Sequence, residues 1–168
     1  MLELTKWNIF KLNKINYISP VSTLQKVYGS GLFIIGAFSI FTSGIGFIFI
    51  AASLYFFQTN GIEINLTTKT YRKTINILSL SFGKWLDLPD IEYVSVFKTT
   101  TSSRVWVSSA STKVTNTVIK VNLFYNTNQK IEAFVADNTK DAFEVAKQIA
   151  SALEVDVLDA TSRDTKWL

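Results

Sequence analysis

The longest apolar segment of the chain lies between residues 27 and 62, where no side chain is charged. Its apolar part, residues 29–57, exceeds the roughly 20 residues with which one helix crosses a bilayer. A single helix over that part would measure about 43 Å, against a hydrocarbon thickness of about 30 Å. The pattern therefore predicts membrane insertion, either as one long, strongly tilted span or as a helical hairpin.

Turn chemistry and flanking charge favour the hairpin. Thr42, Ser43 and Gly44 lie near the middle of the segment and are typical of a turn. Basic residues flank the segment on both sides, so a hairpin with both ends in the cytoplasm satisfies the positive-inside rule twice. We therefore expect a transmembrane helical hairpin over residues 22–59.

The flanks of this hairpin carry two further signals. Ser22 or Thr23 is a plausible N-cap for the first helix, just after the break at Ser19-Pro20. The lead-in, residues 1–21, is basic and contains several aromatic and aliphatic side chains. It forms either an interfacial helix on the headgroups or a partly ordered segment that docks on the rest of the chain.

From Gly61 onward the hydrophobic period changes to two, which is typical of half-buried strands. In the first of these segments Ile62, Ile64 and Leu66 would face inward, with Glu63 among the outward positions. The alternation predicts seven antiparallel strands, over residues 61–67, 71–78, 81–88, 91–98, 99–117, 117–125 and 129–136. The fifth of these is rich in Ser and Thr and is the least regular.

One amphipathic helix closes the predicted β domain, which spans residues 60–158. Asn138 is a good N-cap, and apolar residues recur at helical spacing over residues 139–154. Residues 159–168 read as a polar tail.

Seven antiparallel strands followed by one helix is the element order of the pleckstrin-homology (PH) superfold. Short motifs carry a further resemblance: Gly61-Ile62-Glu63-Ile64, Tyr71-Arg72, Phe82-Gly83-Lys84-Trp85 and Leu88-Pro89. With them the chain resembles uncharacterised bacterial membrane proteins that pair a short membrane hairpin with a PH-like domain. The resemblance implies a membrane α-helical hairpin plus a mainly β soluble domain, a PH-like seven-stranded antiparallel β-sandwich or partly open barrel with one C-terminal α-helix.

Composition narrows the chemistry that the chain can perform. It contains no histidine and no cysteine, so the commonest general base, transition-metal ligand and thiol nucleophile are all missing. The net charge of +4 is spread over 17 basic and 13 acidic residues, without the concentrated basic face of a nucleic-acid-binding protein. Asp87, Asp90 and Glu92 surround a proline turn without calcium-loop spacing and read as a solvated turn. We therefore predict no enzyme, no cofactor, no metal and no small-molecule substrate.

Two sets of residues are candidate contacts. Lys69, Arg72 and Lys73 lie on the first predicted β-hairpin, where eukaryotic PH domains often bind phosphoinositides, so they are candidates for an acidic protein partner or a lipid headgroup. Lys26, Phe82, Lys84 and Trp85 are candidates for the membrane interface, where lysine and aromatic side chains settle. The alternative for Trp85 is a place in the core.

These patterns predict a membrane-anchored, non-enzymatic interaction, scaffolding or regulatory module. Its partners would be the lipid bilayer and a protein or further copies of itself. Its location would be the bacterial inner membrane, with the β domain in the cytoplasm. The alternative is a single-span membrane protein with an extracytoplasmic β domain that acts in envelope assembly or sensing.

Overall fold

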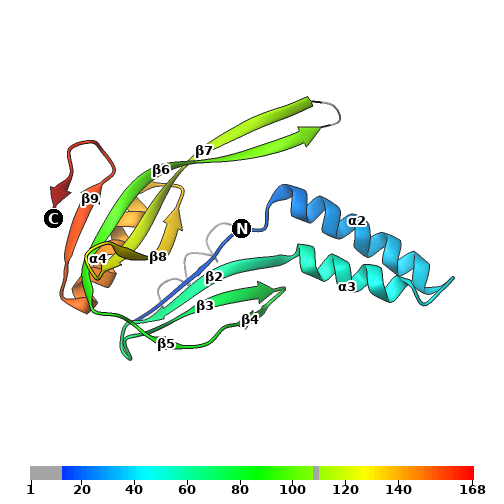
Figure 1. Ribbon diagram of the computed structural model, residues 1–168, viewed down its shortest axis with the longest axis horizontal. Coiled ribbons are helices and arrows are strands. Elements are labelled where there is room, and N and C mark those ends of the chain that lie inside the picture. The colour runs from blue at the N-terminus through cyan, green and yellow to red at the C-terminus, as the bar shows by residue number, and fades with distance from the viewer. Residues whose placement is uncertain (1–12, 108–109) are drawn as a thin grey trace. The chain divides into compact units, whose positions relative to one another are not determined.

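The structure is a computed structural model that describes residues 13–107 and 110–168 (Figure 1). Within these ranges the protein is mainly β, with three helices and ten strands. The helices are α2 (Thr23–Ile40), α3 (Gly46–Phe56) and α4 (Thr139–Leu153). The strands are β1 (Lys14–Ile18), β2 (Gln58–Asn65), β3 (Thr70–Ile77), β4 (Leu80–Phe82), β5 (Leu86–Asp87), β6 (Ile91–Val107), β7 (Ala110–Tyr125), β8 (Gln129–Ala136), β9 (Asp156–Ala160) and β10 (Lys166–Trp167).

The chain divides into two compact units. The first, which we call the α4 unit, comprises the chain up to Tyr17 together with Ile64–Tyr71 and Leu86–Leu168. The second, the hairpin unit, comprises Ile18–Glu63 and Arg72–Trp85 and therefore contains α2 and α3.

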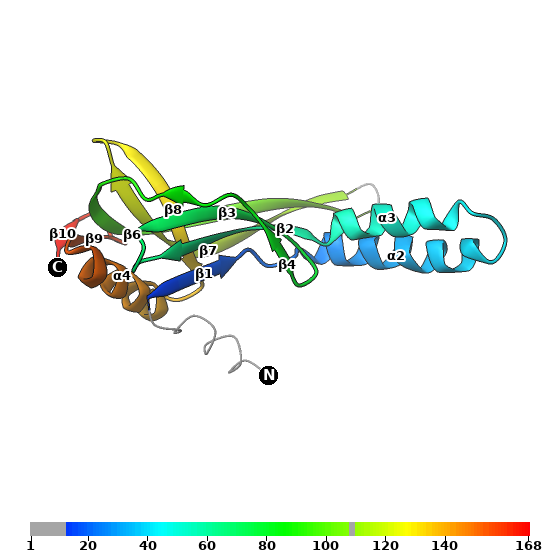
Figure 2. The ribbon, with the colours of Figure 1, turned by 90° about the horizontal axis from the view of Figure 1, so that it is seen from below.

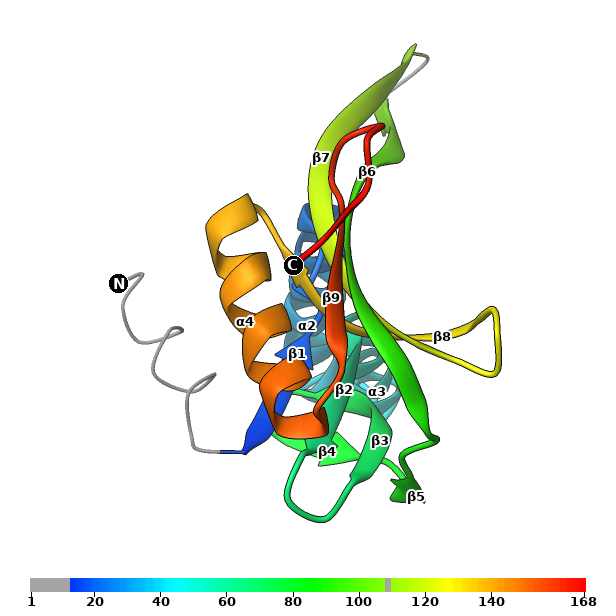
Figure 3. The same cartoon turned by 90° about the vertical axis from the view of Figure 1, so that its left-hand side faces the viewer.

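The α4 unit contains a five-stranded sheet with the order β10-β9-β6-β7-β8. Strands β6 and β7 are antiparallel and pair in register as far as Val107 and Ala110. Strand β9 pairs with β6 in the parallel direction, from Tyr93–Asp156 to Phe97–Ala160. Parallel strands need a long crossover connection, and the segment that holds α4 provides it. Figure 3 shows α4 beside β9 and β7.

Alternating residues of this sheet and one face of α4 form the core of the unit. Val94 and Val96 on β6 and Val121 and Leu123 on β7 are fully buried. Helix α4 contributes Ala142, Val145, Ala146, Ile149 and Ala150, all buried. Its N-cap is Asn138, whose side chain accepts a hydrogen bond from the backbone N–H of Asp141 at 2.9 Å.

A second five-stranded sheet has the order β1-β2-β3-β4, and β5 also pairs with β3. Strand β4 is antiparallel to β3, with Ile75 opposite Phe82. Gly83 follows β4 directly. A side chain at this glycine would collide with the carbonyl oxygen of Lys73, so glycine permits the close approach of the two backbones.

Helices α2 and α3 form an antiparallel hairpin and lie side by side in both views (Figures 1 and 2). Helix α2 begins with a capping box: Ser22 Oγ accepts from Gln25 N at 3.3 Å, and Gln25 Oε1 accepts from Ser22 N at 3.0 Å. These bonds satisfy two of the free N–H groups at the start of the helix. Residues 41–45 then connect the two helices.

The hairpin lies where the sequence predicts helices, but none of the helices in the described ranges combines the length and the apolar character needed to cross a membrane. Helix α3 has 11 residues, which corresponds to about 16 Å at 1.5 Å per residue, or half of the roughly 30 Å hydrocarbon core. Helix α2 contains Gln25 and Lys26 close to its start, which shortens its apolar part. This finding contradicts the predicted transmembrane hairpin over residues 22–59, the alternative of a single span, and the predicted location in the bacterial inner membrane.

The strand pattern also differs from the predicted seven-stranded PH-like sandwich. Residues 99–117 do not form a separate strand, because β6 and β7 run on through them as one long antiparallel ladder. The predicted third strand is divided into β4 and β5. Strands β1 and β10 were not expected, and the predicted polar tail contains β10 and the end of β9. The predicted interfacial helix lies largely in residues 1–12, outside the described residues.

Candidate interaction surfaces

Large apolar side chains lie on the outside of the α2–α3 hairpin. The five most exposed aromatic residues among them have exposed fractions of 60% for Tyr28, 74% for Phe38, 88% for Phe41, 66% for Phe47 and 72% for Tyr55. The other exposed apolar residues of the hairpin are Leu24, Val27, Phe33, Ile34, Ile35, Ile45, Ile48 and Leu54. Scattered apolar residues are ordinary on protein surfaces, but a concentration of this kind marks a binding surface.

Small residues lie on the inside of the same hairpin. Gly29, Gly36, Gly46 and Ser53 are its buried residues. A Cβ atom on Gly36 would lie 2.9 Å from Ile50 Cγ1 and 3.0 Å from the carbonyl oxygen of Gly46. The two backbones approach so closely that larger side chains have no room between them, and the larger apolar side chains point outward.

Arg72 is part of a paired cluster in the hairpin unit. Its Nε and Nη2 atoms each donate to a carboxylate oxygen of Glu63 at 3.1 Å, and its guanidinium carbon lies 4.8 Å from the centroid of the Trp85 ring. The Glu63 side chain is only 5% exposed and that of Arg72 21%. The fork of Arg72 is therefore occupied by a buried carboxylate, which does not favour the predicted contact with a partner or headgroup.

The alternation along residues 61–67 predicts an outward position for Glu63, whereas the structure buries this side chain. Residues 66–69 form the turn between β2 and β3, which brings residue 63 opposite residue 72 across the hairpin. Opposite charges at these two positions were therefore a readable sign of the ion pair. Strand alternation alone does not predict the burial of Glu63, because this residue lies between the buried residues Ile62 and Ile64.

The two lysines of the same candidate set are exposed. Lys69 ends the turn between β2 and β3 with a left-handed backbone (φ 49°), and its carbonyl oxygen accepts from Leu88 N at 2.8 Å. Lys73 lies on β3 with an exposed side chain. Lys69 belongs to the α4 unit, whereas Lys73 belongs to the hairpin unit together with Arg72.

The residues predicted for a membrane interface are spread over the hairpin unit. Lys26 is exposed near the start of α2, Phe82 is exposed on β4, and Lys84 is exposed between β4 and β5. Trp85 is 39% exposed and lies under Arg72, so it is neither a core residue nor a free aromatic. The reason for expecting an interfacial role was the membrane hairpin, which the helices do not support.

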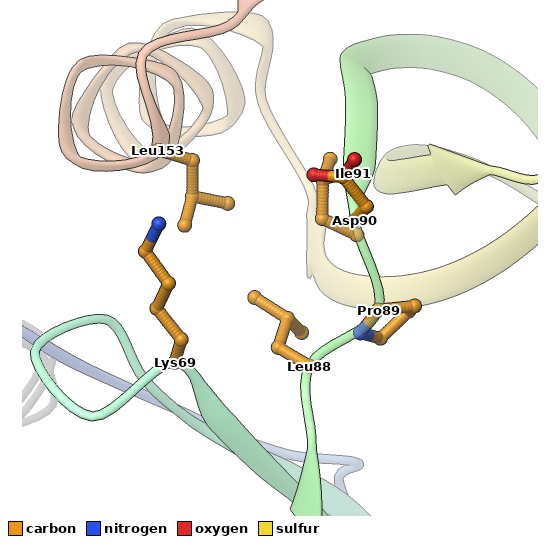
Figure 4. Close-up of a pocket in the computed structure, with 6 residues that line it drawn as sticks. All are labelled: Lys69, Leu88, Pro89, Asp90, Ile91 and Leu153. Carbon is orange, nitrogen blue, oxygen red and sulfur yellow. The ribbon is translucent and has the colours of Figure 1, made fainter.

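A small cavity lies in the α4 unit and has a volume of about 220 Å³ (Figure 4). Its walls are Lys69, Leu88, Pro89, Asp90, Ile91 and Leu153. Small-molecule sites usually enclose about 300–1,000 Å³ and present several convergent polar groups. This cavity is smaller and has one ammonium and one carboxylate, both on exposed residues, so it gives no support to a substrate site.

The acidic residues near this cavity do not converge either. Asp87 and Asp90 are exposed, and Glu92 Oε1 accepts from the backbone N–H of Thr127 at 2.9 Å. In the part of the chain that the structure describes, no group of three acidic side chains is placed to hold a metal ion. Glu92 therefore fixes the β7–β8 turn rather than facing a second carboxylate.

Comparison with known proteins gives no family: no family model, no curated protein and no solved structure matches this chain.

Proposed function

We propose that the chain is a non-enzymatic interaction module that assembles with further copies of itself through the outer face of the α2–α3 hairpin. The observation that carries this proposal is the reversed arrangement of the hairpin, with glycines inside and large apolar side chains outside.

The available area supports a stable contact. An aromatic side chain carries about 150–250 Å², so the five most exposed aromatic residues of the hairpin offer about 600 Å² at their observed exposure. The eight further exposed apolar residues add to this area. A stable interface buries about 800 Å² on each partner, and the hairpin alone can supply it.

Charge supports a second copy as the occupant. Residues 27–62 contain no charged side chain, so two hairpins can face each other without like-charge repulsion and without burying an unpaired charge. A two-fold contact would use the same apolar surface on both copies, as most homo-oligomers do.

The test is the oligomeric state of the full chain in solution, measured by sedimentation equilibrium. The double variant Phe38→Ser/Phe47→Ser removes two exposed aromatic rings of the hairpin. The matched control, Leu78→Ser/Leu80→Ser, removes two apolar side chains of similar exposure outside the hairpin. We expect a dimer or larger assembly for the wild-type chain and the control, and an association at least tenfold weaker for Phe38→Ser/Phe47→Ser.

Three results would overturn the proposal. The first is a wild-type chain that is monomeric at every concentration. The second is a Phe38→Ser/Phe47→Ser variant that assembles as well as the control. The third is a monomeric chain that instead floats with phospholipid vesicles, since the apolar face would then have a different occupant.

A further inference from the structure

Strands β6 and β7 continue as a two-stranded ribbon after their outer partners end. Strand β9 pairs with β6 only as far as Phe97, and β8 pairs with β7 only from Ile119 onward. Within the described residues, β6 from Lys98 and β7 up to Val118 have only each other as partners in the sheet. Figure 1 shows this ribbon running on past β8 and β9. At about 3.3 Å per residue, the free edge of β6 is roughly 30 Å long.

The end of β9 explains why the edge of β6 is free. Asp159 Oδ1 accepts hydrogen bonds from both the backbone N–H and the hydroxyl group of Thr161, at 2.9 Å and 2.7 Å. This local turn leads the chain away after Ala160, and the chain then pairs back on β9 as β10.

The free edge has few of the features that usually protect an edge strand. Residues 98–107 contain no proline, no glycine and no acidic residue, and their charged residues are Lys98 and Arg104. The ladder between β6 and β7 has no bulge from Tyr93 to Val107. A long edge of this kind presents a row of unpaired N–H and C=O groups to an added strand. A ribbon of two strands is also only marginally stable, so a third strand would stabilise it.

We infer that residues 98–106 of β6 pair, in the antiparallel direction, with the same residues of a second copy of the chain. Because both copies use the same edge, residues whose N–H groups point outward must stand opposite each other, so the numbers of two paired residues add to an even sum. Overlap of residues 98–106 places Lys98 opposite Trp106 and Arg104 opposite Thr100. Each basic residue then stands opposite an uncharged one, so the register carries no like-charge pair. Thr101 stands opposite Ser103, a pair that suits cross-strand contacts.

This contact does not involve α2 or α3. It can therefore form whether or not two copies assemble through the hairpin as proposed. A peptide with the sequence of residues 98–107 can replace the second copy. Its binding to the full chain, both wild-type and Phe38→Ser/Phe47→Ser, is measured by fluorescence anisotropy. We expect equal binding to the two chains.

Two N-methylated versions of the peptide test the geometry of the contact. Alternate residues of a strand direct their N–H groups toward the partner, so methylation of the even positions and methylation of the odd positions must act differently. We expect one methylated peptide to bind like the unmodified peptide and the other to bind at least tenfold more weakly. An unmodified peptide that does not bind, or two methylated peptides that bind equally, would overturn the inference.

The register has its own test at Thr100, which is exposed. The chain variant Thr100→Glu places a carboxylate opposite Arg104 of the peptide and should bind it roughly two- to fivefold more tightly, whereas Thr100→Arg should bind it more weakly by a similar factor. Equal affinities of the two variants would exclude this register.

Discussion

Helix α4 and the α2–α3 hairpin use apolar residues in opposite ways. In α4 the apolar residues form one buried stripe and Lys140, Glu144 and Lys147 lie on the exposed side. In the hairpin the buried residues are glycine and serine, and the large apolar side chains are exposed. The apolar character of a segment therefore does not by itself determine whether its side chains are buried or exposed. In α4 apolar burial stabilises the unit itself, whereas in the hairpin the same kind of side chain remains exposed.

The interiors of the two units also differ in chemistry. The α4 unit is held by aliphatic side chains that alternate along β6, β7 and β8. The hairpin unit contains a buried ion pair between Glu63 and Arg72, covered on one side by Trp85. A buried ion pair of this kind tolerates the loss of one partner poorly, because the remaining charge loses a close opposite charge in a buried place.

The largest expected effect comes from breaking that ion pair. Arg72→Met leaves the buried Glu63 carboxylate without this partner and should lower the free energy of unfolding by about 3–5 kcal/mol. Arg72→Lys keeps the charge but loses the bidentate geometry and the stacking on Trp85. It should therefore lower the free energy of unfolding by less than Arg72→Met does. Urea denaturation followed by circular dichroism measures both. The control Lys73→Met, on the exposed side of the same strand, should change stability by no more than about 0.5 kcal/mol. Equal losses for Arg72→Met and Lys73→Met would mean that the pair contributes nothing.

A pair of truncations tests the comparison directly. Ile149→Ala removes a fully buried side chain of α4 and should cost about 2–5 kcal/mol, because it leaves a cavity in the core. Phe38→Ala removes a larger side chain from the hairpin surface and should change the stability of the monomeric chain by no more than about 0.5 kcal/mol. Guanidinium denaturation at low protein concentration measures both. A similar loss at the two positions would show that Phe38 is packed within a single copy.

Local signals in the sequence located the helices and most strands. The capping residues Ser22 and Asn138 precede α2 and α4, and the turn residues at 42–44 lie between α2 and α3. What hydrophobicity did not reveal is the environment of the hairpin. A run of apolar residues predicts burial, but it does not distinguish lipid from another protein surface. The length of α3 decided against a membrane span, and that length depends on where the chain leaves the helix to start β2 at Gln58.

Non-local pairing was the other part that the sequence did not predict. Strand β9 pairs in parallel with β6 although about sixty residues separate them, and no pattern within either segment indicates this partner. The continuation of β6 and β7 through residues 99–117 was missed for a related reason. Serine and threonine give little alternation, so the sequence does not indicate the pairing by which the ladder continues there.

The smallest expected effects come from the two N-caps, which are matched in chemistry but lie in the two contrasting regions. Asn138→Ala removes the acceptor for Asp141 N, and Ser22→Ala removes the acceptor for Gln25 N. Each loss should cost about 1 kcal/mol of helix stability. Because α4 packs its buried stripe on the sheet of its unit, Asn138→Ala should lower the midpoint of global unfolding by a few degrees, at about 2–4 °C per kcal/mol. Ser22→Ala should instead appear as faster amide hydrogen exchange in the first turn of α2. A fall of the global midpoint by the same amount in both variants would show that the hairpin and the α4 unit unfold as one cooperative structure.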